Sequence, residues 1–294
     1  DNGDDGDDGD DRGLGPGCGR EGRRRRNRNR RRRKKDVPKQ SGSERDELVL
    51  AHWNARALVA KEEVWKEQLE REGVDLCMVC ETRMYKCTDL SDKEWMWKPG
   101  QENQPRPGQT PARGMGALTR RSTKSSTVHV SKDLMAERIE MEKGDPIYVM
   151  EAHFPQSSDT RLHAKMWDRV EELYCEYITQ GSVVMMVDAN AHTGANGDHR
   201  KDRAGKMLKR RAKKMHMTII NHTSMCKGKY SWMTERKNGT QSKTTIDYVM
   251  VSPSLVERVK LLQMGETLGS DHRMLTLRRR GAPEQPQIET ERGV

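Results

Sequence analysis

The chain has 294 residues, of which 55 are Lys or Arg and 45 are Asp or Glu, so its net charge at pH 7 is +10. Charged residues make up 34% of the sequence and apolar residues only 32%, whereas a typical globular chain is ~25% charged and ~45–50% apolar with glycine counted. No apolar run approaches the ~20 residues that a membrane-spanning helix needs, which excludes an integral membrane protein and predicts no membrane partner.

The polar excess is concentrated in the N-terminal segment 1–46, which holds 15 basic and 11 acidic residues but only three apolar ones. Burial in such a segment cannot offset the entropy of ordering it. We therefore expect 1–46 to be a disordered tail, acidic at its start and then Arg-rich, and 281–294 to be a second disordered tail. The segment 47–280 keeps enough apolar residues to bury a core and is expected to be the folded domain.

The basic block at 23–35 has two interpretations. It could bind nucleic acid or act as a nuclear-import signal, or it could be a solvated tail neutralised by the acidic start. The chain begins with Asp1 and opens on no signal-peptide pattern, and its six cysteines are typical of reduced thiols in a long, charged chain. We therefore expect an intracellular protein, with nuclear import as one role for the block.

Short apolar strands alternate with amphipathic helices between the two tails. This alternation predicts a layered α/β protein whose strands are buried on both faces. The long polar span 98–127 is expected to be mostly loop. The other expected elements, in chain order, are a strand at 48–51, a helix at 60–69 that stops at Gly73, strands at 76–80 and 147–152, a helix at 162–177 capped by Asp159, a strand at 182–187, a helix at 207–215, and strands at 246–251 and 274–277.

Cys77 and Cys80 form a CxxC pair, a spacing that can bind zinc. The pair lies inside the apolar strand expected at 76–80, and an offset of three residues on a strand points the two thiols to opposite faces. No second CxxC is present to complete a site. The two cysteines are therefore expected to be buried residues of the strand and not zinc ligands.

Polar side chains gather at the ends of the apolar strands: most follow a strand, Asp247 lies inside one, and Asp271 and His272 come directly before the last one. A single Asp in such a place is usually a turn or a helix cap, but several that converge on one sheet edge can build a catalytic cleft. This set is rich in oxygen and has no cysteine, which favours Mg²⁺ or Mn²⁺ over zinc. Its members are Asn54, Glu81, Asp188, Asn190, Asp247, Asp271 and His272.

The order of the motifs around these residues resembles the signature of the endonuclease/exonuclease/phosphatase superfamily, which includes DNase I, exonuclease III and the apurinic endonucleases. The resemblance covers roughly residues 47–279 and implies a DNase I-like four-layer α/β sandwich, two packed β-sheets flanked by helices. The five motifs are Trp53-Asn54, Glu81-Thr82-Arg83, Val187-Asp188-Ala189-Asn190, Ile246-Asp247-Tyr248 and Ser270-Asp271-His272.

Three weaker matches are similar to the retrotransposon-type branch of this superfamily. They are Arg113-Gly114-Met115-Gly116, Ile220-Asn221-His222, and Tyr230-Ser231-Trp232 before the Asn238-Gly239 turn. Elements of that branch usually carry a reverse transcriptase after this domain, and no YxDD-type motif occurs in the chain. The chain is therefore expected to be an isolated endonuclease module or a fragment.

The resemblance implies a metal site on three residues. Glu81 is the expected Mg²⁺ or Mn²⁺ ligand, with Asn54 and Asp271 completing the shell directly or through water. Hydrolysis of a phosphodiester needs charge neutralisation on the phosphate, an activated water and a stabilised leaving oxygen. A divalent ion is the expected cofactor for that reason.

The resemblance also implies catalytic roles. Asp188 occupies the place of the base that orients the water, Asn190 would hold a phosphate oxygen, and His272 would bond to the scissile phosphate while Asp247 orients its ring. His153 stands where the family has a tyrosine, which keeps a hydrogen-bond donor but changes its pKa by several units. These residues predict a metal-dependent phosphodiester hydrolase, and the tyrosine change indicates a diverged copy.

The basic helix region 201–214 and the block at 23–35 favour a nucleic acid as the substrate, and the resemblance to retrotransposon-type endonucleases implies that it is DNA. A solvated helix face is the plain alternative for 201–214. The predicted function is a DNA-nicking endonuclease domain of retroelement type. Two alternatives stay open: a phosphatase acting on a phosphoinositide or another phosphomonoester, and a degenerate copy that binds nucleic acid without cutting it. No obligate protein partner can be read from the sequence.

Overall fold

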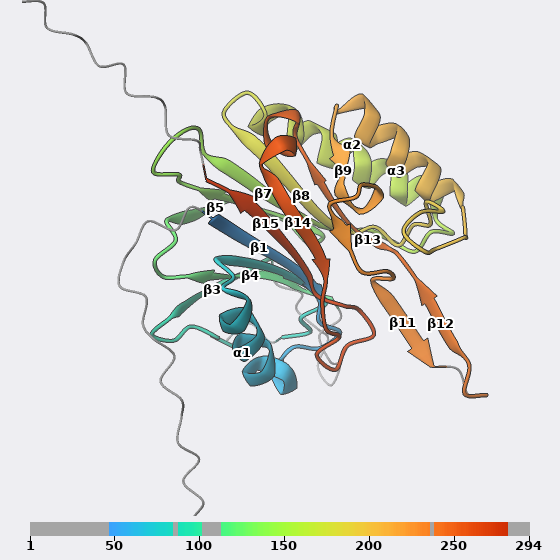
Figure 1. Ribbon diagram of the computed structural model, residues 1–294, viewed down its shortest axis with the longest axis horizontal. Helices are drawn as coiled ribbons and strands as arrows, with labels where there is room; N and C mark the ends of the chain where they lie inside the picture. Colours follow the sequence, from blue (N-terminus) through green and yellow to red (C-terminus); the bar gives the residue numbers. More distant parts are fainter. Residues whose placement is uncertain (1–46, 85–87, 102–112, 236–237, 282–294) are drawn as a thin grey trace, which may run out of the picture. The chain divides into compact units, whose positions relative to one another are not determined.

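The computed structural model describes residues 47–84, 88–101, 113–235 and 238–281 (Figure 1). The expected N-terminal tail, with its basic block, and residues 282–294 of the expected C-terminal tail lie outside these ranges. Among the described helices, none is both long and apolar enough to cross a membrane.

The first sheet has seven strands and contains both ends of the described chain. Its central strands β1 (Glu47–Asn54) and β2 (Leu76–Cys80) are parallel and lie side by side with almost every residue buried, and β15 (Leu275–Arg280) pairs with β1 antiparallel. The strand order is β10 (Cys226–Lys227), β14 (Val259–Met264), β15 (Leu275–Arg280), β1 (Glu47–Asn54), β2 (Leu76–Cys80), β4 (Met115–Arg120) and β3 (Trp95–Pro99).

The second sheet has six strands around the parallel pair β7 and β8. A separate antiparallel hairpin, β11 (Trp232–Glu235) and β12 (Gln241–Thr244), precedes β13 in the chain. The order in the six-stranded sheet is β5 (Ser125–Val130), β6 (Leu134–Ile139), β7 (Ile147–His153), β8 (Ser182–Asp188), β13 (Asp247–Val251) and β9 (Thr218–Ile219).

Three apolar cores hold four layers together. One core lies between the two sheets, a second between the first sheet and α1 (Glu62–Glu72), and a third between the second sheet and the helices α2 (Thr160–Tyr177) and α3 (Arg203–Lys214). Figure 1 shows α1 on one side of the sheets and the pair α2 and α3 on the other. The expected four-layer α/β sandwich is confirmed. Three short 3₁₀ turns complete the elements: η1 (Val59–Lys61), η2 (Ile220–His222) and η3 (Pro253–Arg258).

The strands and helices expected from apolar runs are all present, with ends that shift by a few residues. Asp159 caps α2, because its carboxylate accepts a hydrogen bond from the backbone N–H of Leu162. Gly73 ends α1 in the left-handed conformation, at φ 69°.

The expectation of loop over 98–127 is wrong where the structure describes that span. It contains β4 and the start of β5, and β4 is buried between β2 and β3. A Cβ atom on Gly116 would lie 2.1 Å from the ring of Trp97. The glycine that made this span look like loop is therefore required for a large indole to pack across the strand.

The CxxC pair behaves as its offset predicts. Cys77 packs in the core beneath α1, and Cys80 packs in the core between the two sheets. Both thiols are free and buried, and burial raises the pKa of each.

Candidate active site

Strand register brings three predicted residues together in the second sheet. Asp188, the last residue of β8, is the direct partner of His153 on β7 and of Asp247 on β13. The apolar strand Ser182–Asp188 is buried almost throughout, so its position in the sheet is fixed by packing on both faces. The three side chains therefore meet at one edge of the sheet.

The first sheet delivers its polar residues to the same place. Asn54 ends β1, and its amide Nδ2 donates to Oδ2 of Asp188 at 2.8 Å. Glu81 comes directly after β2, and its carboxylate oxygen Oε1 lies 3.5 Å from Nε2 of His153. The site is thus built where the ends of the two packed sheets meet.

Two of the predicted site residues have a left-handed backbone. Glu81 has φ 49° and Asn190 has φ 44°, conformations that cost a non-glycine residue of order 1 kcal/mol or more. The turn at Glu81 is held by the backbone N–H of Ala57, which donates to the Glu81 carbonyl at 2.8 Å. At Asn190, the backbone N–H donates to Oδ1 of Asp188 at 3.2 Å and the side-chain Nδ2 donates to the Phe154 carbonyl at 3.0 Å.

His272 and Asp247 form the expected carboxylate–imidazole pair. Nδ1 of His272 lies 3.0 Å from both carboxylate oxygens of Asp247, and both residues are buried. Burial alone would lower the pKa of His272, but the charge of Asp247 and its hydrogen bond raise it to about 9. The imidazole is therefore a cation at neutral pH, held in one orientation.

A second buried imidazole, which the sequence analysis missed, lies behind this pair. Nδ1 of His52 lies 2.8 Å from Glu151 and its Nε2 lies 3.3 Å from Asp247, with all three side chains fully buried. Burial would lower the pKa of His52, but the two carboxylates raise it to about 10. The result is a continuous buried chain of alternating imidazoles and carboxylates that runs from His272 through Asp247 and His52 to Glu151, whose pKa is raised by burial against the lowering effect of His52.

The carboxylate of Asp188 has a different environment from that of Asp247. Burial raises the pKa of Asp188, and the neighbouring charge of Asp247 raises it further. The imidazoles of His272 and His153 act in the opposite direction. The pKa of Asp247 is lowered instead, because the imidazoles of His272 and His52 outweigh the effect of burial. Two carboxylates in one site with opposite shifts are typical of acid–base chemistry.

Two groups of side chains could hold a metal ion among the described residues. Glu81, His153 and Asp188 offer ligand atoms within 4.8 Å of one another, and so do Asp188, Asp247 and His272. Oxygen donors with one imidazole suit a hard divalent cation. The predicted ligands Glu81 and Asn54 lie together here.

Asp271, the third predicted ligand, lies in the same cleft but is already occupied. Its carboxylate forms an ion pair with Arg56 and accepts a hydrogen bond of 3.0 Å from Nε1 of Trp232. Glu81 has a similar partner, because Nη2 of Arg83 lies 3.1 Å from its Oε2. Burial would raise the pKa of Glu81, but His153, Asn54 and Arg83 lower it, so this carboxylate is ionised.

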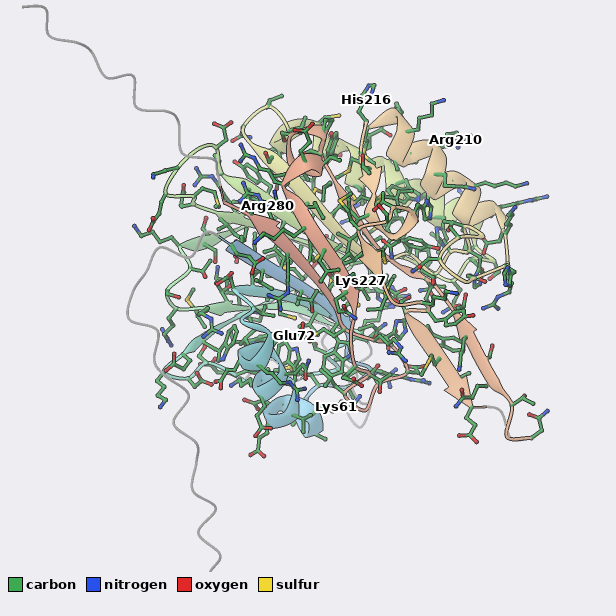
Figure 2. The ribbon with its side chains drawn as sticks, viewed as in Figure 1. Lys61, Glu72, Arg210, His216, Lys227 and Arg280 are labelled. Atoms are coloured by element: carbon green, nitrogen blue, oxygen red, sulfur yellow. The ribbon has the colours of Figure 1, made fainter. Side chains whose placement is uncertain are left out.

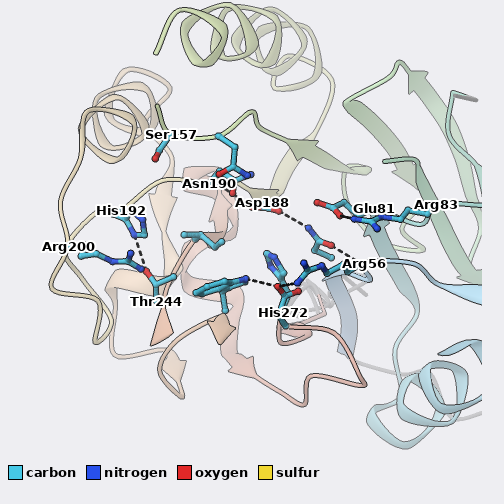
Figure 3. A pocket seen from close by; sticks show the side chains of 15 residues that line it. Arg56, Glu81, Arg83, Ser157, Asp188, Asn190, His192, Arg200, Thr244 and His272 are labelled. Atoms are coloured by element: carbon cyan, nitrogen blue, oxygen red, sulfur yellow. Dashed lines mark hydrogen bonds and ion pairs between the residues drawn. The ribbon is translucent and has the colours of Figure 1, made fainter. Parts of the chain in front are cut away.

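One cleft of about 350 Å³ is lined by most of the predicted site residues, which are Asn54, Glu81, Asp188, Asn190, Asp271 and His272 (Figure 3). His153, Asp247 and the buried His52–Glu151 pair lie outside its lining. Figure 3 shows Glu81 and Arg83 at one end, Asp188, Asn190 and His272 in the middle, and a group at the other end that the sequence analysis did not include. That group consists of His192, Arg200 and Thr244.

One family model matches the sequence, that of an endonuclease–reverse transcriptase family, over residues 147–276. The matched part contains β7, β8 and β13, and with them Asp188, Asp247 and His272. No curated relative matches the chain.

Several solved structures have this fold. The endonuclease domain of TRAS1, a telomere-specific non-LTR retrotransposon, is 12% identical with a TM-score of 0.61, covering 79% of this chain and 98% of that one. The AP endonuclease LMAP from Leishmania major is 13% identical with a TM-score of 0.63, covering 81% and 89%. The 3′ phosphatase NExo from Neisseria, bound to a product DNA hairpin, is 14% identical with a TM-score of 0.58, covering 78% and 98%.

Proposed function

We propose that this chain is a member of the endonuclease/exonuclease/phosphatase superfamily, as the family model over residues 147–276 supports, and that it is a divalent-metal-dependent phosphodiesterase that nicks DNA. The observation that carries the proposal is the meeting of Asp188, the His272–Asp247 pair and Glu81 at the junction of the two sheets. Together they provide a base, a cation and a metal ligand around one cleft.

Asp188 is the base in this proposal. Burial raises the pKa of Asp188 toward neutral pH. A general base transfers protons most efficiently when its pKa is near the pH at which the enzyme works. Asn54 holds one carboxylate oxygen at 2.8 Å and the backbone of Asn190 holds the other at 3.2 Å. The base is therefore fixed in orientation before substrate arrives.

His272 is the cation that faces the phosphate. Its Nδ1 is engaged by Asp247, and its Nε2 has no hydrogen-bond partner in the described part of the chain. A protonated imidazole in this position donates to a phosphate oxygen and stabilises the charge that develops during hydrolysis. The Nδ2 of Asn190 can add a neutral donor on exchanging its present bond to Phe154.

A divalent ion would be held by Glu81, with Asn54 beside it and His153 or Asp188 within reach. When bound, such an ion supplies Lewis-acid charge neutralisation on the phosphate. Asp271 can join the set only if it releases Arg56.

DNA as the substrate is supported by two lines of argument. The TRAS1 neighbour is an endonuclease domain of a retrotransposon, and the NExo neighbour holds a DNA hairpin. In this chain, α3 exposes Arg203, Lys206, Lys209, Arg210, Lys213 and Lys214, a density of positive charge that suits phosphate contacts.

A phosphatase is the second candidate, because the NExo neighbour is described as a 3′ phosphatase. The two functions separate when nicking of supercoiled plasmid and release of phosphate from a 3′-phosphorylated oligonucleotide are measured side by side, with Mg²⁺, with Mn²⁺ and with EDTA. We expect nicking that depends on the metal and falls about 100-fold or more in Glu81→Gln. DNA binding without any cleavage in the wild type would instead favour a non-catalytic copy.

A further inference from the structure

The cleft holds a second carboxylate–imidazole pair at the end opposite Glu81 (Figure 3). Nδ1 of His192 lies 2.8 Å from Oδ2 of Asp198 and 2.9 Å from the hydroxyl of Thr244, which also donates to Asp198. The arrangement has the same parts as the His272–Asp247 pair: a buried carboxylate, one engaged ring nitrogen, and an Nε2 for which the described residues provide no hydrogen-bond partner.

Asp198 contacts Arg200 as well as the imidazole of His192. Its Oδ1 accepts a hydrogen bond of 3.0 Å from the backbone N–H of Arg200 and lies 3.6 Å from the Nε of that side chain. Asp198 is 3% exposed, whereas Arg200 is 54% exposed and His192 17%. One buried carboxylate thus holds an imidazole and a guanidinium at the cleft surface.

The backbone under this group is held on both sides. The backbone N–H of His192 donates to Asp202 at 3.2 Å, and the N–H of Asp202 donates to the His192 carbonyl at 3.1 Å. A Cβ atom on Gly205 would lie 2.0 Å from that carbonyl oxygen, so the first turn of α3 is packed directly on it. His192 is therefore on a fixed part of the chain, which a binding site requires.

We propose that His192 and Arg200 bind a second backbone phosphate, next to the one that is cut between Asp188 and His272. This inference rests on the proposed function and narrows its substrate class to a polynucleotide. A small phosphomonoester that carries a single phosphate would leave these donors empty, whereas each nucleotide of a DNA strand presents a phosphate. Asp198 is a positioning residue in this arrangement, and His192 and Arg200 are substrate-binding residues.

The test compares substrates with one phosphate and with many. The double variant His192→Asn/Arg200→Ala is measured on supercoiled plasmid and on bis(4-nitrophenyl) phosphate, a diester with a single phosphate. The matched control is His216→Asn/Arg280→Ala, which removes the same residue types from exposed positions outside the cleft and outside the basic face of α3 (Figure 2). Thermal unfolding confirms that each variant folds.

We expect kcat/KM on plasmid to fall between about 10-fold and 100-fold in the double variant, the size expected for losing charge-assisted hydrogen bonds. The rate on the single-phosphate diester should stay within about twofold, and the control within about threefold on both. Asp198→Asn should raise KM on plasmid and leave kcat unchanged, a split that a merely structural role would not give.

An equal loss on both substrates, or plasmid nicking within threefold of the wild type, would overturn the second phosphate site. If the wild type cleaves plasmid but not the small diester, or cleaves neither, the dissociation constant for a labelled duplex oligonucleotide decides the inference. The double variant must then bind at least about fivefold more weakly than the control. If the wild type cleaves no substrate but the double variant still binds DNA more weakly than the control, the proposed function is wrong and the second phosphate site stands.

Discussion

Two groups of charged residues at the active site are built in opposite ways. In the first group, Asp188, Asp247 and His272 are almost fully buried, and behind them lies the fully buried pair His52 and Glu151; we call these five residues the buried cluster. In the second group, Glu81 and Asp271 are 22% and 15% exposed and are paired with the arginines Arg83 and Arg56, which are 40% and 56% exposed; we call these the rim pairs.

The contrast separates groups that organise the fold from groups that can exchange partners. A buried charge that loses its partner costs several kcal/mol, whereas an exposed ion pair contributes ~0–1 kcal/mol. The buried cluster is therefore prepared for chemistry before anything binds. The rim pairs can open at small cost, which is what a carboxylate needs if it is to exchange an arginine for a metal ion.

The largest expected effect is on catalysis, from Asp188→Asn in the buried cluster. The amide keeps the shape of the side chain but cannot accept a proton, so we expect nicking to fall by ~10³–10⁴-fold. Stability should fall by ~1–3 kcal/mol, because the amide nitrogen would face one of the two N–H groups that now donate to the Asp188 carboxylate, and relief of the charge repulsion with Asp247 offsets only part of this loss. Plasmid nicking and thermal unfolding measure the two effects. Activity within tenfold of the wild type would exclude Asp188 as the base.

The next effect is on stability, from His52→Leu. This change leaves Glu151 and Asp247 without their shared imidazole inside the protein, and we expect the free energy of unfolding to fall by ~3–5 kcal/mol. The control is His52→Leu/Glu151→Leu, in which both partners of the pair become apolar. It should recover part of the loss. Urea unfolding of the two variants gives the comparison, and equal stability of His52→Leu and the wild type would contradict a paired role for His52.

His52 also shows what the sequence could not reveal. The motifs around Asn54, Glu81, Asp188, Asp247 and His272 lie at the starts or ends of strands, so their meeting at one sheet edge could be predicted from local pattern. His52 and Glu151 lie 99 residues apart within strands of different sheets, and each alone looks like one polar residue interrupting an apolar run. Only the packing of the two sheets brings them together.

The prediction of loop over 98–127 was wrong for a related reason. A glycine or a short polar sequence lowers the local preference for a strand, but tertiary packing overrides this preference where a neighbour needs the space. Gly116 accommodates Trp97 across the sheet, a contact between strands β3 and β4 that no local pattern contains. Similarly, Asp198 reads as a loop residue in the sequence, and its role depends on Thr244 from the distant hairpin strand β12.

A smaller effect, again specific to the buried cluster, is expected from pH. The pKa of His272 is about 9 in the folded protein and ~6.5 in an unfolded chain. The stability from its pairing with Asp247 is therefore fully present below pH ~6.5 and is lost as the pH rises through 9. We expect a loss of ~1–3 kcal/mol over this range, together with a fall in kcat above pH ~9. His272→Gln should make both profiles flatter, as measured by thermal unfolding and nicking from pH 6 to 10.

The smallest expected effect comes from the rim, in Arg83→Ala. Because the Arg83–Glu81 pair is exposed, its loss should change the free energy of unfolding by less than ~1 kcal/mol. The same change frees Glu81 of a competing cation, so the Mg²⁺ concentration that gives half-maximal nicking should fall by about twofold to fivefold. Arg71→Ala, on the exposed side of α1, is the matched control and should leave the metal titration unchanged. If Arg83→Ala instead destabilises the protein as strongly as His52→Leu, the distinction between the buried cluster and the rim pairs does not hold. If it weakens the response to metal, Arg83 assists metal binding by holding Glu81 in place, and the rim is as preorganised as the buried cluster.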